Sequence, residues 1–163
     1  MRVWFNKGFS SLHTALRLLR QGAVQAGQDG VVLCASGAQP QALVALAADQ
    51  YWLEPAGLAT ADYVQWCLDT CRQQAIDVLV PGKAVRALVA QSARFAAQGT
   101  RILAAGDAAT LALLDDKARF YAAVDCPPAP APESITVHTL EEFDAAYAAL
   151  AARHAEVCTK PAV

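Results

Sequence analysis

The chain has 163 residues, of which 55% are hydrophobic and 17% are charged, and its formal net charge is -2. This length suits one domain with a real core, or one domain and the start of a second, and the composition is that of a compact globular chain rather than a disordered one. Because Lys and Arg do not gather into runs, the sequence gives no electrostatic case for binding nucleic acid or an anionic membrane surface.

The N-terminal segment MRVWFNKGFSS lacks the apolar stretch of roughly 7–15 residues that a signal peptide needs. No apolar run approaches the roughly 20 residues of a membrane-spanning helix. We therefore expect a cytoplasmic protein whose cysteines stay reduced. The five cysteines are Cys34, Cys67, Cys71, Cys126 and Cys158.

Up to about residue 105, short apolar runs alternate with longer segments of helical periodicity. The expected elements, in chain order, are a strand at 2–6, a helix at 9–21, a strand at 30–35, a helix after Pro40, a strand at 50–53, a helix at 60–74 that Thr60 caps, a strand at 76–80, a helix at 84–97 and a strand at 100–104. This alternation predicts an α/β domain with a doubly wound, Rossmann-like, five-stranded parallel sheet and helices on both faces. The segment 76–80 is apolar at four of its five positions, which predicts a central strand. The helix at 84–97 is expected to bury Val85, Leu88, Val89 and Ser92.

Two short helices are expected over 107–114 and 116–124. A connector at 126–132 then holds four of the eight prolines, and such a stretch is stiff and marks a domain boundary. We therefore assign residues 1–126 to the first domain and residues 127–163 to the beginning of a second one.

The second segment predicts a β-α-β piece, with strands at 134–138 and 156–160 around a helix that ends near His154. Thr139 and Glu142 form a capping box in which Glu142 is expected to reach back to the Thr139 amide. A β-α-β piece of this size does not bury a core by itself.

Ligands of open α/β sheets bind beyond the carboxyl ends of the strands. There, Lys7 and Gly8 follow the first strand, and Gly82 and Lys83 follow the fourth. We take these four residues as a candidate substrate loop, in which Lys83 can meet an anion at a helix N-terminus. The alternative is a tight turn with a solvated lysine. The two common phosphate-binding motifs, Gly-x-Gly-x-x-Gly and the Walker loop, are absent from the sequence.

Cys67 and Cys71 lie four residues apart on a predicted helix and could share a metal ion. They continue an apolar stripe with Tyr63, Val64 and Leu68, so we interpret them as buried core thiols. The chain has three scattered histidines, His13, His138 and His154. We assign no catalytic residue and no metal ligand within the chain.

Three segments, in order along the chain, resemble parts of the ATP-grasp superfamily. IDVLVPG at 76–82 resembles a strand of the N-terminal domain in the carbamoyl-phosphate-synthase-like branch. LALLDDKARF at 111–120 is similar to the Asp-Lys segment at which ATP-grasp enzymes leave that domain, and VCTKPAV at 157–163 is similar to their Lys-Pro strand.

This resemblance implies a pre-ATP-grasp domain followed by the start of an ATP-grasp domain, which is the N-terminal portion of an ATP-dependent carboxylate ligase. Such ligases activate a small-molecule carboxylate as an acyl phosphate. Lys117 and Lys160 match the family lysines that bind ATP phosphates, and a lysine ammonium suits this task. The family's glycine-rich loop and its magnesium ligands are expected beyond residue 163. The portion given is therefore expected to be inactive by itself.

Lys83 stands where relatives often carry an acidic residue nearby, so the resemblance does not identify the substrate. A free-standing α/β module that binds a ligand or a protein, without catalysis, is the alternative function. The sequence also leaves a homodimer open.

Overall fold

The computed structural model describes residues 1–6, 11–124, 126, 128 and 130–160. The chain divides into two compact units, Met1–Ala108 and Ala109–Val163. The division falls ahead of the boundary after residue 126 that the sequence suggested. Among the described residues, none of the helices is both long enough and apolar enough to span a bilayer.

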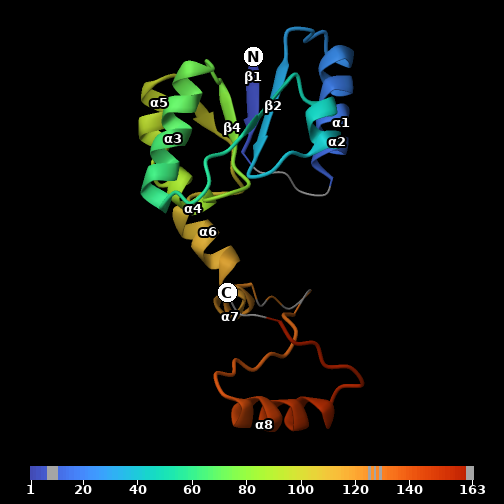
Figure 1. Cartoon of the computed structure of the whole chain (residues 1–163). Helices are drawn as coiled ribbons and strands as arrows, with labels where there is room; N and C mark the ends of the chain where they lie inside the picture. Colours follow the sequence, from blue (N-terminus) through green and yellow to red (C-terminus); the bar gives the residue numbers. More distant parts are fainter. Residues whose placement is uncertain (7–10, 125, 127, 129, 161–163) are drawn as a thin grey trace. The chain divides into compact units, whose positions relative to one another are not determined.

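The first unit contains a five-stranded, all-parallel sheet flanked by helices, which confirms the predicted α/β fold (Figure 1). The strand order across the sheet is β3-β2-β1-β4-β5. The strands are β1 (Arg2–Phe5), β2 (Val32–Gly37), β3 (Gln50–Leu53), β4 (Val78–Val80) and β5 (Arg101–Ile102).

The prediction that segment 76–80 forms the central strand was wrong, because β1 is in the middle and β4 lies between β1 and β5. A strand that is apolar on both faces is expected to lie in the interior of the sheet. Its composition does not say which interior position it takes, because that depends on the crossover connections.

Helices cover both faces of the sheet (Figure 1). On one face are α1 (Leu12–Gln25) and α2 (Ala42–Ala47), and on the other are α3 (Thr60–Gln73), α4 (Val85–Val89) and α5 (Ser92–Ala97). Because side chains alternate along a strand, Phe5 points into the α1/α2 core and Trp4 into the α3/α4/α5 core.

Three local predictions in this unit need correction. Thr60 is the first residue of α3 and its cap is Ala59, without a side-chain hydrogen bond. The single helix expected at 84–97 is two helices, and at their junction the Ser92 hydroxyl donates to the Val89 carbonyl oxygen (2.5 Å). Ser92 was expected to be buried but is exposed, and Phe95 is the fully buried residue of α5.

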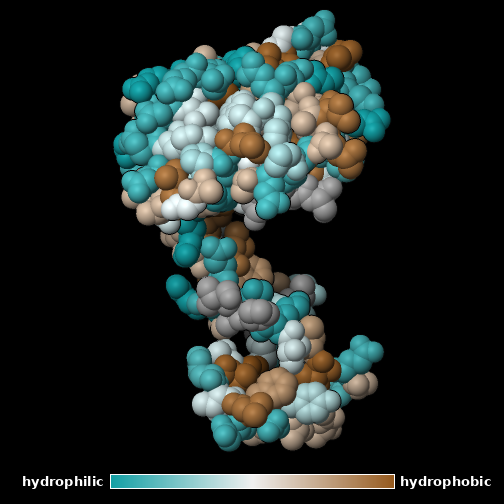
Figure 2. Space-filling model, viewed as in Figure 1, coloured by the Kyte–Doolittle hydropathy of each residue, from teal (hydrophilic) through white to brown (hydrophobic). Residues whose placement is uncertain are grey.

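The second unit holds most of α6 (Ala108–Asp115), together with α7 (Lys117–Ala123) and α8 (Leu140–Ala151). Figure 2 shows hydrophobic side chains on its visible surface. The strands expected at 134–138 and 156–160 are irregular segments in the structure, so that prediction was wrong. An apolar run becomes a strand only where a neighbour completes its backbone hydrogen bonds, and a sequence pattern does not supply that neighbour.

The capping box at the start of α8 is present, with one difference. Thr139 Oγ1 accepts the Glu142 N–H (3.1 Å), as expected. Glu142 Oε2 accepts the N–H of His138 (2.6 Å) rather than that of Thr139. The Glu142 side chain therefore anchors the residue before the cap instead of the cap residue itself.

Candidate functional site

The second unit contains a cavity of about 710 Å³. Its lining comes from α7, from the segment 132–137, from α8 and from the segment 154–160. Pockets that bind small molecules generally measure roughly 300–1,000 Å³, so this cavity is large enough for a nucleotide.

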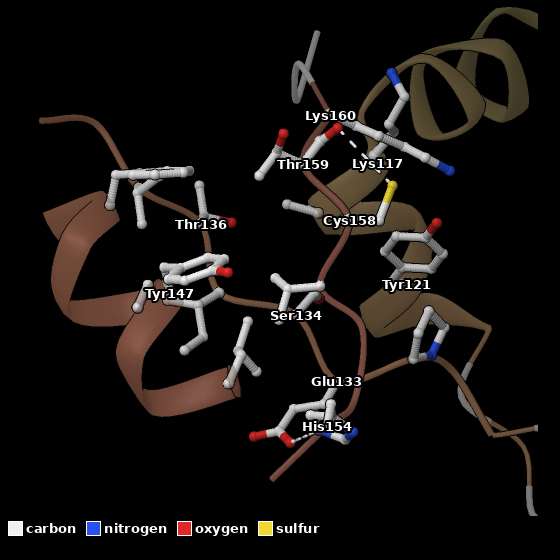
Figure 3. Close-up of a pocket in the computed structure, with 18 of the residues that line it drawn as sticks. Lys117, Tyr121, Glu133, Ser134, Thr136, Tyr147, His154, Cys158, Thr159 and Lys160 are labelled. Atoms are coloured by element: carbon white, nitrogen blue, oxygen red, sulfur yellow. Dashed lines mark hydrogen bonds and ion pairs between the residues drawn. The ribbon is translucent and has the colours of Figure 1, made fainter. Parts of the chain in front are cut away.

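Both lysines that the sequence singled out line this cavity (Figure 3). Lys117 is the first residue of α7 and is half-buried, and Lys160 is exposed in the segment after α8. The carboxylate of Asp116, next to Lys117, accepts the Arg119 N–H (3.0 Å) and caps α7. The arrangement brings two lysines, 43 positions apart in the sequence, to the lining of one cavity.

A second wall of the cavity is apolar and comes mainly from α8. Phe143, Tyr147 and Leu150 follow one another at helical spacing on the face that lines the cavity. The rings of Phe143 and Tyr147 are stacked, with centroids 6.3 Å apart. Flat apolar rings of this kind pack well against another planar ring.

At the other end of the cavity, as seen in Figure 3, lies the carboxylate of Glu133. Glu133 contacts His154 Nε2 at 2.9 Å and Arg153 Nη2 at 2.7 Å. The hydrogen bond from His154, together with Arg153, lowers the pKa of the Glu133 carboxyl. The cavity is therefore polarised, with lysines at one end and this carboxylate at the other. His154 is the one histidine among its lining residues.

The candidate substrate loop belongs to the first unit. Lys7 and Gly8 lie outside the described residues. The N–H groups of Gly82 (2.7 Å) and Lys83 (3.3 Å) donate to Asn6 Oδ1, and Asn6 Nδ2 donates to the Lys83 carbonyl oxygen (3.2 Å). A fully buried carboxamide thus joins the end of β1 to the loop after β4.

The Lys83 ammonium also has defined partners. Its Nζ lies 3.1 Å from Glu54 Oε2 and 4.1 Å from the centroid of the Tyr63 ring. The other oxygen of Glu54 accepts the Ser36 hydroxyl (2.9 Å), and Ser36 Oγ in turn accepts the indole N–H of Trp4 (2.9 Å).

Sequence reasoning missed Asn6, Glu54 and Tyr63 as members of this cluster. Tyr63 was interpreted only as part of an apolar stripe. The signal that could have found Asn6 and Glu54 is that each directly follows a strand of a parallel sheet, at the edge where ligands bind.

Cys67 and Cys71 are confirmed as buried core thiols. Burial raises the pKa of each from 9.0 to about 12, because desolvation penalises the thiolate. In the part of the chain that the structure describes, no three side chains of His, Cys, Asp or Glu come together as a metal site.

Comparison with models of known protein families gives no match for this chain, and a search of curated proteins gives none either.

Proposed function

We propose that this chain is the N-terminal portion of an ATP-dependent carboxylate ligase of the ATP-grasp type, and that Lys117 and Lys160 bind the phosphates of ATP. One observation carries the proposal: both lysines line the same cavity of about 710 Å³. The order of the three family-like segments along the sequence supports it independently.

The cavity suits the parts of a nucleotide. Two lysines line one end of it, and their flexible stems can bring compact ammonium groups to phosphate charge. The apolar wall with Phe143 and Tyr147 offers a stacking surface for a base. Magnesium would stabilise the charge of the transferred phosphoryl group, and its ligands are expected beyond residue 163. We also propose that the protein works in the cytoplasm on a small-molecule carboxylate.

The test is a calorimetric titration with ATP and magnesium of the wild-type protein and of the variants Lys117→Met and Lys160→Met. Methionine keeps an apolar stem and removes the charge. A charge-assisted contact contributes roughly 1.5–3 kcal/mol, so each variant should bind ATP about tenfold more weakly or worse.

Arg119→Met is the matched control. Arg119 lies on the same short helix as Lys117 and also carries a positive charge, but it does not line the cavity. This control should leave ATP affinity unchanged, and thermal melts should show that all variants fold. Unchanged affinity in both lysine variants would contradict the proposed ATP site and would favour the alternative of a non-catalytic binding module.

A further inference from the structure

Four strands of the first unit end in one polar cluster at the carboxyl edge of the sheet. Asn6 follows β1, Ser36 lies near the end of β2, Glu54 follows β3 and Lys83 follows β4. The chain passes from β1 to β2 on one side of the sheet and reaches β4 on the other side. The cluster therefore lies where the strand order reverses, which is where open α/β sheets bind their ligands.

Glu54 is the most unusual member, because its side chain is only 1% exposed. Both of its oxygens have partners, the Ser36 hydroxyl and the Lys83 ammonium. A buried ion pair is often no more stabilising than an apolar pair of the same size. The presence of such a carboxylate at a ligand-binding edge is therefore better explained by a function of its partner lysine.

Lys83 is held in place but remains open to solvent. Its side chain is 42% exposed, while Glu54, the Tyr63 ring and the backbone bonds to Asn6 fix its position. An ammonium group has three N–H donors, and Glu54 engages one of them. The remaining donors can serve a ligand that approaches the exposed part of this side chain, and the contacts of Lys83 already fix the position of its ammonium.

We propose that Lys83 binds the carboxylate of a small ligand at this edge of the first unit, and that Glu54 is the residue that positions its ammonium. Lys83 offers a single ammonium that is already paired with Glu54, and one such group offsets the desolvation cost of a singly charged carboxylate better than the larger cost of a phosphate dianion. Identifying this ligand as the carboxylate that the ligase activates rests on the proposed function. The binding of a carboxylate at Lys83 does not.

The cluster contains its own reporter. The chain has three tryptophans, and the rings of Trp52 and Trp66 lie 5.5 and 5.6 Å from the ring of Trp4. The Trp4 indole N–H reaches Glu54 through Ser36. A ligand on Lys83 should therefore shift the Trp4 indole signal in a nitrogen-proton NMR spectrum.

The experiment is a titration with sodium acetate, with ionic strength held constant by sodium chloride. The wild-type protein should show a saturating shift of the Trp4 indole signal and of the Lys83 ammonium signal. In the double variant Lys83→Met/Glu54→Gln, which leaves no unpaired buried charge, acetate should bind at least about tenfold more weakly. The control Arg17→Gln removes an exposed positive charge of the same unit and should behave as the wild type.

Inorganic phosphate is the second arm of the experiment and should bind more weakly than acetate. Tighter phosphate binding would overturn the assignment to a carboxylate. A response that does not saturate, or an equal response in the double variant, would overturn the site itself. The Lys83 ammonium signal is read in the wild-type protein, so the test does not depend on folding of the variant. The ATP titrations report on the other unit, so failure of one proposal is distinguishable from failure of the other.

Discussion

At the scale of single residues, the first unit keeps several polar side chains out of water and gives each of them partners. Asn6 and Ser36 are fully buried, and both take part in the hydrogen bonds at the carboxyl edge of the sheet. Thr100, also buried, donates to the Ile76 carbonyl oxygen (2.7 Å). Buried polar groups without partners would cost roughly 1–3 kcal/mol each, so these bonds specify how the ends of the strands meet.

The buried thiols of α3 predict that the protein loses stability in alkaline solution. The folded state holds the pKa of Cys67 and Cys71 at about 12, against 9.0 for an ordinary thiol. Their contribution to stability is complete below about pH 9 and is lost as the pH rises toward about 12, because only the unfolded chain releases these protons. In that range, each thiol should lower the free energy of unfolding by about 1.4 kcal/mol per pH unit.

Urea unfolding at several values between about pH 8 and about pH 10.5 measures this slope. The double variant Cys67→Ala/Cys71→Ala should show a clearly smaller slope, although Cys34 and Tyr63, whose pKa values burial also raises, keep it above zero. Cys158→Ala is the control, since this thiol is exposed, and it should keep the wild-type slope. Equal slopes in all three proteins would show that the α3 thiols do not govern the alkaline loss.

At the scale of elements, α8 depends on its cap because no residue on it is buried. The Thr139 hydroxyl accepts the Glu142 N–H, and Glu142 holds the His138 N–H. Replacing Thr139 with alanine should destabilise the helix by about 1 kcal/mol. Hydrogen exchange of the α8 amides should then become about fivefold faster.

Thr139→Ser provides the matched control, since it keeps the hydroxyl that accepts the hydrogen bond. It should exchange close to the wild-type rate. If alanine and serine give the same exchange rates, the side-chain cap does not stabilise α8.

At the scale of the whole molecule, the two units differ in how much of a core they have. Both hydrophobic clusters belong to the first unit. In the second unit, among the described residues, Leu111 alone is a buried hydrophobic side chain. Large apolar side chains such as Leu140 and Tyr147 are exposed there, so the second unit gains much less from the hydrophobic effect.

We therefore expect the second unit to unfold at a lower urea concentration than the first. All three tryptophans lie in the first unit, so fluorescence follows only that unit, while far-ultraviolet circular dichroism follows the helices of both. The dichroism signal should begin to fall before the fluorescence changes, as in a transition that is not two-state. Superimposable curves from the two probes would mean that the chain unfolds as one cooperative body.

Much of the fold could be predicted from the sequence because it rests on local patterns. The alternation of apolar runs and helical stripes predicted the five parallel strands, and segment 50–53 matches β3 in both of its bounds. The apolar stripe around Cys67 indicated which face of α3 is buried. Strand lengths were predicted less well: β5 has two residues rather than five, because its pairing depends on how far β4 extends beside it.

Some residues of the candidate sites could likewise be predicted from the sequence, and others could not. Lys117 and Lys160 could be singled out from motifs, and the family resemblance gave them a role that stays a proposal. The cluster around Lys83 could be foreseen only in part, because Asn6, Glu54 and Tyr63 are brought to it from two strand ends and a helix.

The sequence by itself determined the α/β class and the buried faces, because these follow from apolar periods of two and of about 3.6 residues. Only the tertiary structure decided that β1 is the middle strand, that segments 134–138 and 156–160 are not strands, and that Lys83 pairs with Glu54. Each of these depends on contacts between residues far apart in the chain. A sequence pattern describes the surface that a segment offers, and the fold decides which other segment packs against it.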